Sequence, residues 1–263
     1  MVNQTYRLIL DSGVNIYFLL FVLFSTICSY SFHWYLTSNS VIPSSRIKWV
    51  ERNRNVHLAL FIIGLIGSGI FFFYLFPYWP WLLLSAIITF LYSAPKIPHP
   101  LFRALRKVAL GKTIFLALVW MNVTTLLPIL ISGEPWRNDF TLFILSRFFL
   151  IYAICILFDY RDLEDDKAAG IRSLITFLSE KGILYLFTFS LIVFAISTIL
   201  LYPEGYTILS IIILLIPGII TACLYTYAKR NFSDLFYYFV LDGLMAFSAL
   251  LMLIPGNWLF LHT

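Results

Sequence analysis

An acidic segment at residues 159–166 carries the side chains of this chain that are best suited to chemistry. These eight residues hold five of the thirteen acidic side chains. Carboxylates crowded in this way raise one another's pKa values unless cations neutralise them. Their hard oxygen atoms suit Mg²⁺, which proteins commonly bind together with substrate phosphates. The segment therefore predicts a site that holds Mg²⁺ and a ligand carried by the metal.

The spacing of three aspartates sharpens this prediction. If the preceding apolar run continues as a helix, Asp159, Asp162 and Asp166 stand at positions i, i+3 and i+7, within an arc of roughly 60°. They are our candidate metal ligands and catalytic residues. An EF-hand is excluded, because the spacing differs and the mid-loop glycine is missing. The alternative is a solvated acidic helix end that Arg161 and Lys167 partly neutralise.

The elements that position this segment are membrane helices. The chain is 61% hydrophobic and 12% charged, with a mean hydropathy of +0.90, and its long uncharged runs are typical of transmembrane helices. We predict an all-α, polytopic transmembrane bundle of about eight spans, forming a single domain over residues 1–263. The third span is short. The runs lie near residues 13–36, 56–76, 78–95, 112–131, 139–158, 182–202, 206–228 and 235–254.

The distribution of positive charge predicts an orientation. Of the eighteen Lys and Arg residues, fifteen lie in or beside alternate connections between the spans. Such connections face the cytoplasm by the positive-inside rule, which puts the acidic segment on the cytoplasmic side and both termini outside. Topology thus accounts for the basic balance without nucleic acid. We expect an integral protein of a bacterial inner membrane, with the bilayer around it and no protein partner.

A few residues are unusual within apolar runs. Gly64, Gly67 and Gly69 in the second span predict close helix packing. Arg147 and Asp242 are charges deep in their spans, where charge is costly and tends to pair or to serve function. In one arrangement these two side chains pair with each other. In the other, Arg147 extends to the membrane surface and Asp242 lines a hydrated cavity.

The acidic segment also carries a family resemblance. Residues 159–174 read DYRDLEDDKAAGIRSL, which resembles the second aspartate-rich motif of the UbiA superfamily of intramembrane prenyltransferases, roughly D-x-x-D-x-x-x-D-K-x-x-G-x-x-T-L. Ser173 replaces the usual Thr, and Asp165 stands where Gly is common. The run from Tyr92 to Lys96 is similar to the Y-x-x-x-K element of that family, and residues 107–120 resemble its entry to the following helix.

The resemblance implies a function and assigns roles. Family members bind a polyprenyl diphosphate through Mg²⁺ held between two aspartate-rich motifs, and the prenyl group then alkylates a hydrophobic acceptor. Tyr92 and Lys96 join the three aspartates as candidate catalytic residues. Lys96, Arg106 and Lys107 become candidate diphosphate ligands. The implied partners are a prenyl diphosphate and an aromatic or lipid acceptor.

The chain departs from the family pattern at the first aspartate-rich motif. The corresponding residues 29–36 contain no carboxylate, and no acid occurs between Asp11 and Glu51. His33 and Arg46 are candidate phosphate contacts there; the alternatives are an interfacial histidine and a solvated orientation charge. The family has nine spans, so a count of eight with the N-terminus outside leads us to expect that the first helix is missing.

Three functions remain open at this point. The leading one is an Mg²⁺-assisted prenyltransferase of the UbiA type. The alternative is a degenerate relative that binds an isoprenoid or lipid phosphate without turnover, which the missing first motif favours. A transporter that uses Arg147 and Asp242 is a third class, although paired broken helices in two repeated halves are absent from the sequence.

Overall fold

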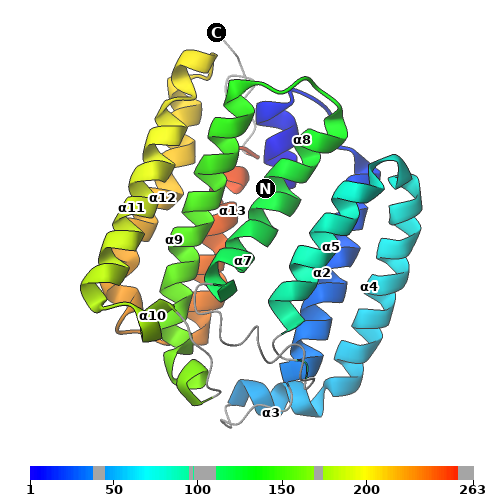
Figure 1. Ribbon diagram of the computed structural model, residues 1–263, viewed down its shortest axis with the longest axis vertical. Coiled ribbons are helices and arrows are strands. Elements are labelled where there is room, and N and C mark those ends of the chain that lie inside the picture. The colour runs from blue at the N-terminus through cyan, green and yellow to red at the C-terminus, as the bar shows by residue number, and fades with distance from the viewer. Residues whose placement is uncertain (38–44, 95–96, 98–110, 169–173, 254–263) are drawn as a thin grey trace.

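The computed structural model describes residues 1–37, 45–94, 97, 111–168 and 174–253, and every regular element in these ranges is a helix (Figure 1). The helices are α1 (Val2–Gln4), η1 (Thr5–Ile9), α2 (Ile16–Thr37), α3 (Ser45–Arg52), α4 (Arg54–Tyr74), η2 (Phe76–Tyr78), α5 (Trp79–Ser93), α7 (Gly111–Met121), η5 (Asn122–Leu126), α8 (Leu127–Ser132), α9 (Asn138–Ala168), α10 (Leu174–Phe177), α11 (Glu180–Ile199), η6 (Tyr202–Glu204), α12 (Ile208–Ala228), η7 (Phe236–Leu241) and α13 (Asp242–Leu251). The predicted all-α class is confirmed.

The membrane spans follow the apolar runs of the sequence. Within the described ranges, six helices are long and apolar enough to cross a membrane, and two apolar helices, Phe76–Leu91 and Phe236–Leu251, are shorter. Each corresponds to one of the eight predicted runs, and the third is short as expected. The polytopic bundle is therefore confirmed. The correspondence arises because hydropathy is a local property of each run.

Helix α9 is the centre of the bundle. It packs against α7, α11, α12 and α13, whereas α2, α4 and α5 lie on the far side of α7 (Figure 1). Of the residues in its apolar stretch, 67% are buried inside the bundle, compared with 11% for α2 and 17% for α4. All residues from Leu150 to Leu157 are buried. The acidic segment is thus the direct continuation of the most enclosed of the six candidate spans in the described structure.

Helices α2 and α4 pack closely through two of the predicted glycines. A Cβ atom on Gly64 would lie 2.5 Å from the backbone nitrogen of Cys28, and one on Gly67 would lie 2.3 Å from the ring of Phe24. A Cβ on Gly69 would meet no atom within 4 Å. Close packing is therefore confirmed for Gly64 and Gly67 and is wrong for Gly69.

This difference gives a stability prediction with an internal control. Gly64→Ala should destabilise the protein by about 1–3 kcal/mol, because the clash is with backbone and the two helices must separate. Gly69→Ala should be neutral or slightly stabilising, since alanine favours helix. Thermal unfolding of the detergent-solubilised variants measures both. Equal melting temperatures for the two variants would contradict the close approach of α2 and α4.

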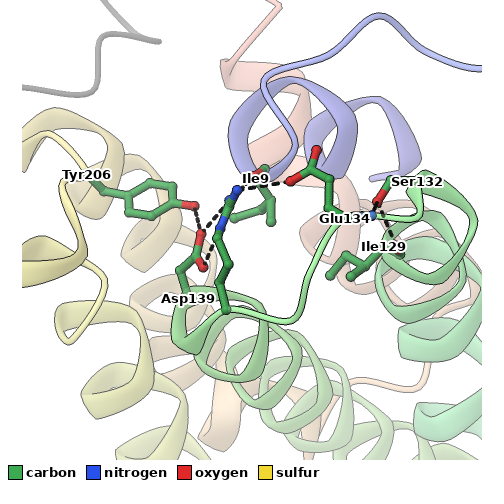
Figure 2. Close-up of polar contacts among 7 residues, drawn as sticks. Ile9, Ile129, Ser132, Glu134, Asp139 and Tyr206 are labelled. Carbon is green, nitrogen blue, oxygen red and sulfur yellow. Dashed lines mark hydrogen bonds and ion pairs between the residues drawn. The ribbon is translucent and has the colours of Figure 1, made fainter.

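A polar clamp joins the chain at the end of the bundle opposite the acidic segment (Figure 2). Arg137 donates hydrogen bonds to both carboxylate oxygens of Asp139 at 3.1 and 2.9 Å, to Glu134 at 2.9 Å and to the carbonyl oxygen of Ile9 at 2.7 Å. Tyr206 donates to Asp139 at 2.7 Å. Burial raises the pKa of the Tyr206 hydroxyl, and its bond to Asp139 acts in the same direction, so it stays a donor. The clamp fixes the start of α9 to the N-terminal segment.

Candidate functional site

Helix α9 runs without interruption through the acidic segment to Ala168. The condition for the aspartate stripe is therefore met, and Asp159, Asp162 and Asp166 occupy positions i, i+3 and i+7 of one helix. Lys167 in the last turn suits the negative end of the helix dipole. The side chains of residues 164–166, and with them the predicted ligand Asp166, lie outside the described part of the structure.

Asp159 is buried, unlike Asp162, the other member of the stripe whose side chain is described. Asp159 is 2% exposed. Thr113 in the first turn of α7 donates a hydrogen bond to the Oδ2 atom of Asp159 at 2.7 Å. The Thr113 hydroxyl carries no charge, so this bond orients the carboxylate and leaves its charge in place. A fixed carboxylate at a membrane helix end is suited to binding a cation.

Asp162 lies one turn further along and is more open. Its side chain is 20% exposed, and its Oδ1 atom contacts Arg161 twice, at 2.9 Å from Nε and 2.8 Å from Nη2. This charge-assisted pair restricts the rotamer of Asp162. The described carboxylates thus differ: Asp159 is enclosed and oriented by a neutral donor, whereas Asp162 is accessible and held by a cation.

Those of the other predicted site residues that the structure describes lie at the same end of the bundle. The C-terminal ends of α2, α5 and α9 and the start of α7 share one end of the bundle (Figure 1). His33 near the end of α2 lies 3.4 Å from the hydroxyl of Ser93, measured from Nδ1 to Oγ. Tyr92 precedes Ser93 in the last turn of α5. Outside the described part are Lys96, Arg106 and Lys107, and the side chains of Tyr92 and Arg46 (in α3).

Both arrangements expected for Arg147 are wrong. The Arg147 residue is 1% exposed, so it does not extend to the membrane surface. Its Nη1 atom donates to the hydroxyl of Ser248 at 3.0 Å, and no described ion pair joins it to Asp242. Ser248 lies six residues further along α13 than Asp242, about 9 Å by helical rise. Asp242 instead interacts electrostatically with Arg161.

Two contributions to the site were missed at the sequence level. Thr113 is separated from Asp159 by 46 positions, and only the packing of α7 on α9 brings them together. The sequence offers one signal for Thr113, namely that it is a polar residue at the start of an apolar run. The sequence predicts Arg161 only as a neutralising charge, and its electrostatic interaction with Asp242 depends on the packing of α13 against α9.

The donor chemistry fits a hard divalent cation shared with phosphate. Among the described side chains, no three of the His, Cys, Asp and Glu type are grouped closely enough to hold a metal alone. Mg²⁺ commonly takes one or two protein carboxylates and completes its shell with substrate phosphates and water. Asp159 and Asp162 meet that requirement without a closed protein cage.

The fold and the site together define a class: an integral membrane helical bundle with carboxylates at one end of its central helix. Residues 36–250 match the model of the UbiA prenyltransferase family. The match covers most of the chain, from the last residues of α2 into α13, and the chain belongs to this family. In the same comparisons, neither a curated protein nor a solved structure matches it.

Proposed function

We propose that this protein is a membrane prenyltransferase that moves a polyprenyl group from a prenyl diphosphate to an aromatic or lipid acceptor with the help of Mg²⁺. One observation carries the proposal. The central helix of a UbiA-family bundle continues unbroken into the acidic stripe and presents a buried Asp159 and an accessible Asp162 at its end. The other described acids do not lie on this continuation of the central helix within the family motif.

The residues of the chain supply positioning and electrostatics. Thr113 fixes the carboxylate of Asp159, and Arg161 fixes that of Asp162. Bound Mg²⁺ would neutralise the diphosphate as negative charge develops on it. The bond between the allylic carbon and the diphosphate oxygen breaks with its electron pair on the oxygen. An electron pair of the acceptor then forms the new bond, and the acceptor loses a proton.

Further roles belong to the proposal. Asp166 would add a third carboxylate to the stripe, and Tyr92 and Lys96 would complete the catalytic set. The diphosphate would be held by Lys96 together with Arg106 and Lys107, and by His33 and Arg46 from the N-terminal side. We place this site on the cytoplasmic face of a bacterial inner membrane, with both termini outside and residues 1–263 forming one domain.

The second candidate function is binding of an isoprenoid or lipid phosphate without turnover. The observation in its favour is the absence of any acid between Asp11 and Glu51, which removes one half of a two-sided Mg²⁺ clamp. Both hypotheses predict binding of an isoprenoid phosphate, but only the first predicts that the bound ligand reacts.

Diphosphate release tests the proposal. The detergent-purified protein is supplied with Mg²⁺, labelled prenyl diphosphates of several chain lengths and a panel of aromatic and lipid acceptors. We expect Mg²⁺-dependent release of diphosphate and a prenylated acceptor. Mg²⁺-dependent binding without release would support the second candidate and overturn the enzyme. Neither binding nor release would overturn both.

A further inference from the structure

Arg161 is held in an aromatic cage beside the candidate metal ligands. Its guanidinium carbon lies 5.0 Å from the ring centroid of Phe158, 5.2 Å from that of Tyr237 and 4.6 Å from that of Tyr238. Tyr237 is itself fully buried and donates its hydroxyl to the carbonyl oxygen of Ala228 at 2.8 Å. The cage therefore comes from α9 and η7, and its fully buried ring, that of Tyr237, is hydrogen-bonded to the last residue of α12.

One guanidinium nitrogen of Arg161 has no hydrogen-bond partner. A guanidinium has five N–H donors on three nitrogens. Nε and Nη2 both contact Asp162, whereas Nη1 is buried and has no hydrogen-bond partner. Aromatic faces attract the cation but are not full substitutes for an oxygen acceptor. A buried donor without an acceptor is costly and calls for an explanation.

Neighbouring acids do not satisfy this nitrogen. Asp234 and Asp242 both interact electrostatically with Arg161, yet neither accepts a hydrogen bond from Nη1. Lys229 at the same end of the bundle offers a contrast. It also lies over two tyrosine rings, of Tyr160 and Tyr225, but it has an acidic partner in Glu180. The unpaired donor thus distinguishes Arg161 from Lys229, the other cation that lies over aromatic rings at this end of the bundle.

We propose that Nη1 of Arg161 donates a hydrogen bond to an oxygen of the substrate diphosphate, beside the cation bound at Asp159 and Asp162. This inference rests on the proposed function. Arg161 thereby becomes a substrate-contacting residue of the site as well as the partner of Asp162. Since residues 29–36 provide no carboxylates for a second metal-binding motif, a permanent protein cation replaces part of the positive charge that such a motif would recruit.

A purely positioning role makes a different prediction. If Arg161 served only to hold Asp162, its loss would weaken Mg²⁺ binding, and excess Mg²⁺ would restore the affinity for diphosphate. If it contacts the diphosphate directly, the loss persists at saturating Mg²⁺. Removing a cation next to Asp162 should also leave the Mg²⁺ requirement unchanged or lower it, because the local repulsion of Mg²⁺ falls.

The experiment measures binding of an unreactive prenyl thiodiphosphate to the full chain in detergent across an Mg²⁺ titration. We expect Arg161→Met to raise the Kd at saturating Mg²⁺ by about 10- to 100-fold, the scale of one charge-assisted hydrogen bond. The half-saturating Mg²⁺ concentration should not rise. Arg161→Lys keeps the charge and lacks Nη1, and it should raise the Kd about tenfold. Lys229→Met, the matched loss of a nearby caged cation, should stay within about twofold.

The outcomes distinguish a failure of the role proposed for Arg161 from a failure of the proposed function. Wild-type affinity of Arg161→Lys and Arg161→Met at saturating Mg²⁺ would overturn the inference and leave the proposed function standing. Loss of affinity that excess Mg²⁺ repairs would assign Arg161 to positioning alone and would also overturn it. A wild-type protein that binds no thiodiphosphate at any Mg²⁺ concentration would overturn the proposed function itself.

Discussion

Asp162→Asn should lower the rate of diphosphate release by at least about 100-fold, the effect of removing a charge that stabilises a transition state. The substitution keeps the shape of the side chain and removes the charge of an accessible carboxylate in the stripe. It also leaves Arg161 without its ionic partner. The rate is measured at saturating Mg²⁺ with the prenyl diphosphate and acceptor that the wild-type protein uses.

Glu180→Gln is the matched control for this substitution. Glu180 lies at the start of α11, and its side chain is 72% exposed and paired with Lys229. Its neutralisation removes the same charge from the protein and should change the rate less than about twofold, because exposed pairs contribute little. Full activity of Asp162→Asn would show that the acidic stripe is not the site of diphosphate chemistry. Equal losses in both variants would point to the charge of the whole protein.

The sequence was sufficient for features that depend on local periodicity. The apolar runs predicted the spans because hydropathy needs no knowledge of neighbours. The stripe of Asp159, Asp162 and Asp166 required only that a helix continue, and half of residues 159–168 are good helix formers. Family membership rested on the same local pattern. These predictions are confirmed by the helices and by the family match.

Contacts between helices could not be predicted in this way. Which face of α13 meets α9 depends on the rotation and tilt of both helices, and hydropathy carries little of that information. The pairing of Arg147 with Asp242 failed for this reason, since Ser248 on the same helix meets the guanidinium instead. The Arg161–Asp162 contact joins adjacent residues that do not face each other on a helix. In the structure the guanidinium of Arg161 lies over the rings of Tyr237 and Tyr238 in η7 as well as against Asp162.

Arg147→Met should increase the free energy of unfolding by about 2 kcal/mol, because it replaces a buried charge in the bundle by an apolar side chain of similar length. Arg147 contacts Ser248 and the ring of Phe143 at 4.9 Å from the guanidinium carbon. Its Nε and Nη2 atoms are buried and have no hydrogen-bond partner. Methionine is flexible enough to fill the vacated space without strain. Unfolding of the purified protein in a denaturing detergent titration measures the change.

Arg137→Met provides the opposite case within the same chain. The guanidinium of Arg137 is satisfied by Glu134, Asp139 and the carbonyl oxygen of Ile9, so its removal leaves the buried Asp139 without its cation and should destabilise the protein. The two substitutions are chemically identical and differ only in the partners of the arginine. If Arg147→Met also destabilised the protein, the guanidinium would have to gain more from Ser248 and Phe143 than it loses by burial. A stabilised Arg147→Met with reduced prenyl transfer would instead indicate that the buried charge is retained for function at the expense of stability.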